Sequence, residues 1–417
     1  MRILLVSING DGAWFVHLLA KTHDVQWLCT SEKDADTLKG LVPAPLKRSP
    51  DPSKYDLIVF DKSGLGQAAD DACLITPTIG SSAIADQLEH DRVFGIEAME
   101  HAGINVPPWE PFTKAADAIS WLGEHNVRTV LKPIGDAPAD ATYVSKSAAD
   151  MIHYIETRLG SKVKEFLLQE FVEGVEVSTE GWWTGTEWVA MNHTLEEKKF
   201  MAGGIGPNTG CAGNVLWMID KPNPLFQQGL DKIAPFLSET GYVGMIDLNT
   251  IVTEGGVYGL EWTPRFGYEG TCNLTRLLPM EFGEFLHHVA IGKVPTLGPA
   301  RARFAATVKL SVPPYPYAER SHKHDHIPVA GIDTDHLESF YLCDVMVDGD
   351  ALVTGGTYNG IGSPIGCAET IAGAFDEVDA MIARVDAPNL QYRNDIAKCV
   401  ESRYNDLRSW GWLRKIG

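Results

Sequence analysis

Residues Gly241 to Gly267 read GYVGMIDLNTIVTEGGVYGLEWTPRFG. Two runs rich in β-branched and apolar residues flank a turn signal at 253–256, TEGG, which predicts an antiparallel hairpin. Each arm carries one acid, Asp247 and Glu261. A three-residue loop would place these acids opposite each other, and a two-residue loop would place them one position off. Two carboxylates held on rigid strands favour a cation such as Mg²⁺ between them, although an ordinary hairpin with acids facing water has the same pattern.

The composition is that of a globular protein with several domains. The chain has 417 residues, 44% hydrophobic and 22% charged, which predicts two to four domains. A net charge of -20 argues against a nucleic-acid or anionic-membrane surface. The seven cysteines form no CxxC pair, and no apolar run reaches transmembrane length. We therefore expect a cytoplasmic protein with small-molecule partners, no membrane contact and no direct nucleic-acid contact.

The first hundred residues alternate between strand and helix patterns. Strands at Arg2–Ser7, Val25–Thr30 and Leu57–Asp61 predict a parallel α/β sheet. The sequence NGDG at 9–12 follows the first strand. It either cradles a phosphate or forms a plain strand-to-helix turn. A single helix is predicted over Ser81–Gly103.

Candidate nucleotide-binding residues follow in the next segment. Lys132 lies within the apolar strand Thr129–Pro133, where a lysine is costly unless it meets an anion. It is a candidate phosphate ligand, and the alternative is an edge lysine that faces water. The strand Glu165–Val172 then leads into FVEGVEVS at 171–178. A backbone connection there could read an adenine edge, and Glu176 just beyond it could accept the ribose hydroxyls.

A lysine pair and a glycine-rich stretch come next. Lys198 and Lys199 precede a segment with five glycines that we expect to be a loop open to a ligand, with a solvated lysine pair as the alternative. A helix at Leu225–Thr240 leads into the opening hairpin. The final block predicts further strands and a helix, and its tract SHKHDH at 321–326 is more typical of a polar loop than of a metal site. In this final block, strands are predicted at Ala305–Ser311, Leu337–Asp348 and Ala351–Gly360, and a helix is predicted at Cys367–Arg384.

Taken in order, the chain resembles the phosphoribosylamine–glycine ligase (glycinamide ribonucleotide synthetase) family of the ATP-grasp superfamily, as a divergent member. The motifs that carry the resemblance are QLEHDRVFGIEAMEHAGINVP at 87–107, FVEGVEVS at 171–178, EEKKFMAGGIGPNTGCAG at 196–213, LEWTPRFG at 260–267, VDGDALVTGGTYNGIG at 347–362 and YRNDI at 392–396.

The resemblance implies a multidomain α/β and α+β architecture with an ATP-grasp fold. An N-terminal pre-ATP-grasp α/β domain is expected at 1–108, a small lid subdomain at 109–180, a large subdomain at 181–300 and a C-terminal mixed α/β domain at 301–417. A monomer or weak homodimer is expected.

The resemblance also implies a reaction, ATP-dependent ligation of a carboxylate to an amine through an acyl phosphate. The implied cofactors are ATP and Mg²⁺, or Mn²⁺ in its place. The implied residue roles are ATP binding by Lys132, Gln169, Glu170, Val172 and Glu176, metal binding by Asp247 and Glu261, catalysis by Arg265 and Lys198, and substrate binding by Gly206, Pro207, Asn208, Thr209, Gly210 and Arg265.

Several positions depart from the family pattern. NGDGAWF replaces the family's GGREHAL, APADA replaces its lysine-bearing GKG loop and brings in Asp140, and Thr263 and Tyr268 replace an Asn and an Asp of its metal motif. Two readings follow besides the purine-pathway step. One is a ligase with a different amine acceptor, such as a modified nucleotide. The other is a nucleotide-binding pseudo-enzyme or scaffold without turnover. Other ATP-grasp chemistry, carboxylation or phosphorylation, is a third class.

Overall fold

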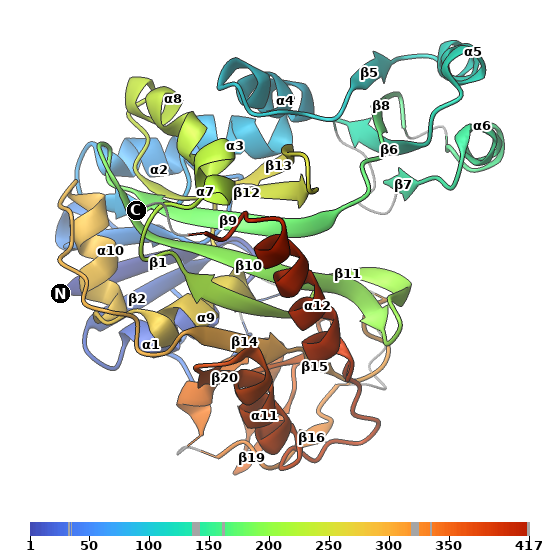
Figure 1. Cartoon of the computed structure of the whole chain (residues 1–417). Helices are drawn as coiled ribbons and strands as arrows, with labels where there is room; N and C mark the ends of the chain where they lie inside the picture. The colour runs from blue at the N-terminus through green and yellow to red at the C-terminus, as the bar shows by residue number, and fades with distance from the viewer. Residues whose placement is uncertain are drawn as a thin grey trace.

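Four β-sheets organise the computed structural model, which describes residues 1–31, 34, 36–135, 142–160, 163–317, 325–333 and 336–414 (Figure 1). The largest is an antiparallel sheet in the order β13-β12-β9-β10-β11-β14-β20-β15, with β17 paired to β20. Its strands are β9 (Val175–Trp183), β10 (Trp188–Met201), β11 (Ile205–Met218), β12 (Gly244–Val252), β13 (Val257–Thr263), β14 (Phe304–Val308), β15 (Leu310–Ser311), β17 (Phe340–Leu342) and β20 (Gly360–Ala368). The predicted hairpin is therefore the β12–β13 edge of this central sheet.

The N-terminal sheet is parallel, as predicted, with the order β2-β1-β3-β4. Its elements are β1 (Arg2–Ser7), α1 (Ala13–Leu19), β2 (Asp24–Cys29), η2 (Pro52–Lys54), β3 (Leu57–Phe60), α2 (Gly66–Cys73) and β4 (Thr78–Ile79). The chain leaves β1 for β2 on one side and later returns to β3 on the other. The carboxyl ends of β1 and β3 therefore flank the crevice where doubly wound sheets bind ligands.

A four-stranded antiparallel sheet, here the small sheet, stands at one end of the molecule (Figure 1). It has the strand order β5-β8-β6-β7, and two helices pack on it through a core that includes Leu122, Leu131 and Met151. Because side chains alternate along a strand, burial of Leu131 under the helices turns Lys132 to the opposite face. The elements are β5 (Trp109–Phe112), α5 (Ala115–His125), β6 (Thr129–Ile134), β7 (Tyr143–Val144), α6 (Ala148–Thr157) and β8 (Glu165–Glu170).

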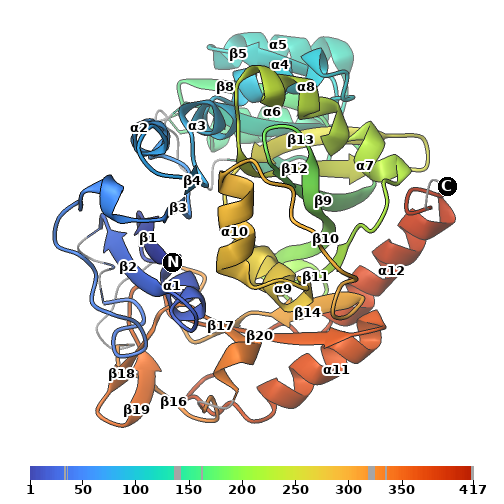
Figure 2. The ribbon, with the colours of Figure 1, turned by 90° about the vertical axis from the view of Figure 1, so that its left-hand side faces the viewer.

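The C-terminal residues extend the central sheet as well as forming a sheet of their own. Helix α11 (Ile371–Ile382) packs on β14 and β20, and α12 (Ile396–Ser409) packs on β10 and β11 (Figure 2). The separate sheet contains β16 (Pro328–Val329), β18 (Val345–Asp348) and β19 (Ala351–Thr354). The four-domain division stays a proposal, since β14 and β20 of the 301–417 segment complete the sheet that begins at β9.

Two predicted helices are broken by local chemistry. Ser81–Gly103 forms α3 (Ala83–His90) and α4 (Arg92–His101), because Asp91 has an extended backbone and its carboxylate caps α4 by accepting from the Phe94 amide at 3.1 Å. Leu225–Thr240 forms α7 (Pro224–Gln228), the 3₁₀ turn η4 (Leu230–Ile233) and α8 (Ala234–Glu239), because Gly229 adopts a non-helical φ of -109° and ψ of -107°. Two further helices, α9 (Tyr268–Leu277) and α10 (Phe282–Ala290), follow the hairpin.

The predicted C-terminal strands are shorter than expected. Leu337–Asp348 divides into η6 (Leu337–Ser339), β17 and β18, because the Asp344 carboxylate between the strands accepts the Tyr358 and Asn359 amides at 2.7 Å. The strand predicted at Ala351–Gly360 ends at Thr354, and the helix predicted from Cys367 begins at Ile371. Asp140 and the first four residues of the histidine-containing tract lie outside the described residues.

Candidate functional site

Polar side chains cover one face of the central sheet in rows that run across the strands. Residues directly opposite each other on antiparallel strands share a face. One row, here the Asn249 row, contains Glu261, Asn249, Ser178 and Thr194. The next, here the Glu180 row, contains Asp247, Glu180 and Asn192.

The hairpin register differs from the prediction. Asp247 pairs with Thr263, and Glu261 pairs with Asn249, so the two acids are two positions out of line. The cause is a four-residue connection between Val252 and Val257, which pair directly, together with a bulge between Asn249 and Thr250. Both acids still share one face, but Asn249 rather than Asp247 is the neighbour of Glu261.

Asn249 has the features of a metal ligand beside Glu261. Its Nδ2 donates to Glu176 Oε1 at 3.0 Å, which fixes the amide so that the buried Oδ1 has no hydrogen-bond partner. Mg²⁺ in nucleotide sites takes one or two protein oxygens and completes its shell with phosphates and water. No set of three acidic, histidine or cysteine side chains in the described ranges could hold a metal alone. The donor set at Glu261 and Asn249 therefore fits a metal that arrives with phosphate.

Lys132 reaches this row from the small sheet. Its side chain is buried, and its Nζ donates to the Leu260 carbonyl of β13 at 3.4 Å. Burial lowers the pKa of Lys132 to about 8, while the nearby Glu261 opposes the shift. The alternative of an edge lysine facing water is therefore wrong. Arg92 at the start of α4 adds a second cation, with its Nε donating to the Pro133 carbonyl at 3.0 Å.

Glu176 and Lys198 form an ion pair on the same face. Lys198 Nζ lies 2.6 Å from Glu176 Oε1. Burial by itself would raise the pKa of Glu176, but Lys198 and the Asn249 amide outweigh it and lower that pKa. Burial would likewise lower the pKa of Lys198, and Glu176, Glu261 and Glu196 together raise it. The alternative of a solvated lysine pair does not describe Lys198.

The predicted adenine connection lies between the small and central sheets. Gln169 is buried at the end of β8, and the Glu170 amide donates to the Pro108 carbonyl at 2.8 Å. The strand was predicted to extend to Val172, but β8 ends at Glu170. Val172 therefore belongs to the connection. The chain re-enters the central sheet at Val175, one residue before Glu176.

Arg265 ends the hairpin and borders a small cavity. Its Nε donates to Glu89 Oε1 of α3 at 3.2 Å. The cavity has a volume of about 160 Å³ and is lined by Glu89, Arg92, Glu261 and Arg265, among others. Burial would lower the pKa of Arg265, and the neighbouring Glu89 raises it. Arg265 is thus held charged within reach of the Asn249 row.

The glycine-rich segment was predicted to be a loop, and this prediction is wrong. The segment forms the end of a long hairpin. Gly206, Pro207, Asn208, Thr209 and Gly210 lie on β11, and Lys199 pairs with Asn208. The chain ahead of α12 holds this arm. Arg393 lies 2.8 Å from Glu197 and donates to the Lys199 carbonyl at 3.0 Å, and Asp395 accepts the Gly203 amide at 2.7 Å. The arm is strand because pairing with β10 satisfies its backbone groups.

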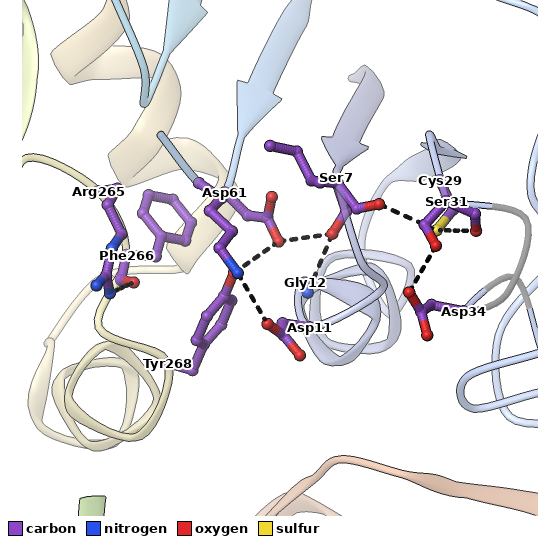
Figure 3. A network of polar contacts seen from close by, with 12 residues as sticks. Ser7, Asp11, Gly12, Cys29, Ser31, Asp34, Asp61, Arg265, Phe266 and Tyr268 are labelled. Carbon is purple, nitrogen blue, oxygen red and sulfur yellow. Dashed lines mark hydrogen bonds and ion pairs between the residues drawn. The ribbon is translucent and has the colours of Figure 1, made fainter. Parts of the chain in front are cut away.

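The crevice at the ends of β1 and β3 is occupied by acids (Figure 3). Asp61 is fully buried, and its Oδ2 accepts from the Ser7 hydroxyl at 2.8 Å and the Tyr268 hydroxyl at 3.3 Å. Burial raises the pKa of Asp61 to about 7. Asp11 of the NGDG turn faces Lys62 at 3.5 Å. With two carboxylates beside it and only a seven-residue helix after it, this turn matches the plain-turn alternative better than the phosphate cradle.

Sequence reasoning did not single out three polar residues that lie on or beside the polar face of the central sheet: Arg92, Asn249 and Glu180. Arg92 is polar at a helix start, where such residues are common on any surface. Asn249 and Glu180 are single polar residues in strands that otherwise look apolar. The signal that could have found the last two is their period: Asp247 and Asn249, like Glu176, Ser178 and Glu180, recur at every second residue, which places each set on one face.

Comparisons with known proteins support the same fold. Residues 90–271 match the phosphoribosylglycinamide synthetase ATP-grasp (A) domain family. A phosphoribosylamine–glycine ligase of Leptospira interrogans is 24% identical over 379 residues, which cover 86% of each chain. The crystal structure of the corresponding Thermotoga maritima ligase is 20% identical, covers 95% of this chain and 100% of that one, and has a TM-score of 0.76.

A more distant structure shares the fold. A biotin carboxylase domain from Hydrogenobacter thermophilus, solved with MgADP, ADP and bicarbonate, is 12% identical, covers 100% of this chain and 99% of that one, and has a TM-score of 0.64. The architecture is therefore the ATP-grasp fold. In the part of the chain that the structure describes, no helix has the length and apolar character needed to span a bilayer.

Proposed function

We propose that this chain, an ATP-grasp ligase that resembles phosphoribosylamine–glycine ligase, joins an amino acid such as glycine to an amine, with conversion of ATP to ADP and phosphate. The observation that carries the proposal is the meeting of Lys132 from the small sheet with Glu261 and Lys198 of the central sheet. Clustered cations beside carboxylates suit a nucleotide polyphosphate with its metal.

In this proposal ATP lies between the two sheets. Lys132 and Arg92 contact its phosphates, and the backbone of Glu170 and Val172, with Gln169 beside them, borders the adenine. Glu176 accepts the ribose hydroxyls. Glu261 and Asn249 would hold Mg²⁺, or Mn²⁺, whose bound charge would neutralise the phosphates. Asp247 is not retained as a metal ligand, since Asn249 occupies the position opposite Glu261.

The proposed chemistry has two steps. A carboxylate oxygen of the amino acid attacks the γ-phosphorus of ATP, the bond to the bridging oxygen breaks, and ADP leaves. The amine nitrogen then attacks the acyl phosphate carbon, phosphate leaves with the bonding electrons, and the nitrogen loses a proton. Arg265 would stabilise the negative charge that develops on the acyl phosphate. Lys198 and residues 206–210 would line the acceptor side and exclude water.

Release of ADP and phosphate from Mg-ATP tests the proposal. Purified protein receives glycine and freshly made phosphoribosylamine, and each is then omitted in turn. Release that needs both substrates assigns the purine-pathway step. Release with glycine alone, or only when another amine is supplied, assigns a ligase with a different acceptor. ATP binding by calorimetry without release for any acceptor contradicts the ligase and supports a nucleotide-binding protein.

A further inference from the structure

The Glu180 row holds three acceptor oxygens that the protein leaves without partners. Glu180, Asp247 and Asn192 are 6%, 9% and 0% exposed, and they are direct neighbours on three adjacent strands. Glu180 Oε1, Asp247 Oδ1 and Asn192 Oδ1 are each buried with no hydrogen-bond partner. A buried acceptor without a donor costs about 1–3 kcal/mol, and a charged one costs more. Three such atoms side by side are unusual for a purely structural feature.

The basic side chains nearest this row have other partners. Lys198 Nζ lies 2.6 Å from Glu176, and Arg265 Nε lies 3.2 Å from Glu89. Among the described residues, no lysine, arginine or histidine forms an ion pair with Glu180 or Asp247. The third acid that faces them, Glu196 of β10, adds to the negative charge. Ser178 hydrogen-bonds Asp247, but Glu180 Oε1, Asp247 Oδ1 and Asn192 Oδ1 remain without a donor.

The missing donor is best supplied by a nitrogen cation. An ammonium group carries three N–H donors and no acceptor, which matches the three oxygens that lack a donor once the carboxyl groups of the row are ionised. Neighbouring strands are about 4.8 Å apart, so an ammonium in contact with Glu180, the middle member, can reach either Asp247 or Asn192. A phosphate or carboxylate would instead meet two acids, and the electrostatic energy would be unfavourable.

We propose that the Glu180 row is the recognition site for a protonated amino group of a ligase substrate. The proposal rests on the proposed function and names the substrate chemistry of the same sheet face. The row lies two residues along β12 from Asn249, or about 7 Å from the proposed metal position. Arg265 follows Thr263, the β13 neighbour of Asp247, by two residues. A substrate with both an amino group and a carboxylate could therefore span from Glu180 to Arg265.

Calorimetry with simple probes tests the recognition site. Ethylammonium chloride, glycine, sodium propionate and potassium chloride are titrated separately into the protein with Mg-ATP present, at matched ionic strength. Ethylammonium and glycine are expected to bind, and propionate and potassium are not. Glu180→Gln is expected to weaken ethylammonium binding by roughly tenfold or more, the size of one charge-assisted hydrogen bond. Glu187→Gln, which removes an exposed charge from the turn of the same β9–β10 hairpin, should bind as the parent does.

A second measurement needs no variant. The charged and titratable groups that interact with one another at the row are Glu180, Asp247, Glu196, Lys198 and Arg265. Burial raises the pKa of Glu180 to about 8 and that of Glu196 to about 7, so these carboxyl groups are protonated in mildly acidic solution. Affinity of the parent protein for ethylammonium is therefore expected to rise at least tenfold between roughly pH 5.5 and pH 8.5, while ammonium itself stays charged.

Three results would overturn the proposal. They are equal binding of propionate and ethylammonium, binding of potassium as tight as that of ethylammonium, and unchanged ethylammonium affinity in Glu180→Gln. Failure of the recognition site and failure of the ligase proposal are distinguishable. If Glu180→Gln releases ADP with parental affinity for glycine and for every amine, only the recognition site is wrong. If ethylammonium binds as expected but no substrate pair releases ADP, only the ligase is wrong.

Discussion

Glu176 and Glu180 lie four positions apart on β9, on the same face of one sheet, and the protein treats them in opposite ways. Glu176 accepts from Lys198 and Asn249, and its pKa is lowered. Glu180 is more deeply buried, has a partnerless oxygen and has its pKa raised to about 8. The difference teaches that the charge of a carboxylate here depends on whether its neighbours supply donors, because residue type, strand and face are shared. The Glu176 part of the face, next to the Asn249 row, has a cation for its acid. The Glu180 row has no ion-pair partner for its acids among the described residues.

Removing the acid of the Asn249 row should have the largest effect. Glu261→Gln deletes one charge of the proposed metal site, and we expect ADP release to fall by about a hundredfold or more, since such metal interactions are worth several kcal/mol. The measurement is ADP formation at saturating Mg-ATP. Glu254→Gln, an exposed acid on the turn of the same hairpin, is the matched control. Full activity in Glu261→Gln would remove Glu261 from the metal site.

The dependence of ADP release on Mg²⁺ concentration tests whether the metal binds at the Asn249 row or at the Glu180 row. Asn249→Ala removes the proposed ligand oxygen, and we expect the Mg²⁺ concentration for half-maximal ADP release to rise roughly tenfold. Asp247→Asn should change that concentration by less than about threefold, because Asp247 belongs to the Glu180 row. The opposite ranking of the two variants would return Asp247 to the metal site and break the division proposed here.

Glu180→Gln should stabilise the ligand-free protein, and the gain should depend on pH. The folded pKa of about 8 lies above the unfolded value, so ionisation penalises the fold. The penalty is absent below about pH 4, builds as pH rises toward 8 and is complete above it. We expect the variant to gain on the order of 2 kcal/mol at pH 8.5 and little at pH 5. Urea unfolding at both pH values measures the gain, and a pH-independent difference would contradict it.

Lys198→Met should lower the free energy of unfolding, the opposite of Glu180→Gln, because it leaves Glu176 without its cation. The side chains of Lys198 and Glu176 are 33% and 39% exposed, so solvent screening reduces the stability lost when the ion pair is removed. We expect a loss of about 1 kcal/mol, between the values for exposed and buried pairs. Urea unfolding at pH 7 measures it. Replacement of Glu176 by Gln in the Lys198→Met background should recover part of the loss, and an additive double variant would show that the pair is not coupled.

The smallest effect is expected at Asp61 in the N-terminal crevice. Asp61→Asn keeps an acceptor for the Ser7 and Tyr268 hydroxyls and removes a carboxyl group whose folded pKa is raised to about 7. Because ionisation of this buried group penalises the fold, the stability gain should appear as pH rises from about 4 to 7 and stay below about 1 kcal/mol after solvent relaxation. Thermal unfolding at pH 5 and pH 8 tests it. A clear destabilisation at pH 8 would show that the Asp61 anion is required.

The sequence by itself determined several of the strands, most of helix α11 and the ATP-grasp fold. Apolar runs with β-branched residues identified β1, β3 and β12 because burial on a sheet demands that pattern. Lys132 stood out because a lysine inside such a run needs an anion. The motifs around FVEGVEVS and LEWTPRFG then indicated an ATP-grasp architecture, which the comparisons confirm.

Only the tertiary structure decided which side chains meet. The four-residue connection and the bulge at Asn249 together shifted the hairpin so that Asn249, not Asp247, faces Glu261, and no local propensity specifies that shift. Breaks at Asp91 and Gly229 depended on capping and backbone geometry within longer helical patterns. The Glu180 row joins residues from three strands that are up to 67 positions apart in the chain (247 minus 180), and their shared environment exists only once the sheet is assembled.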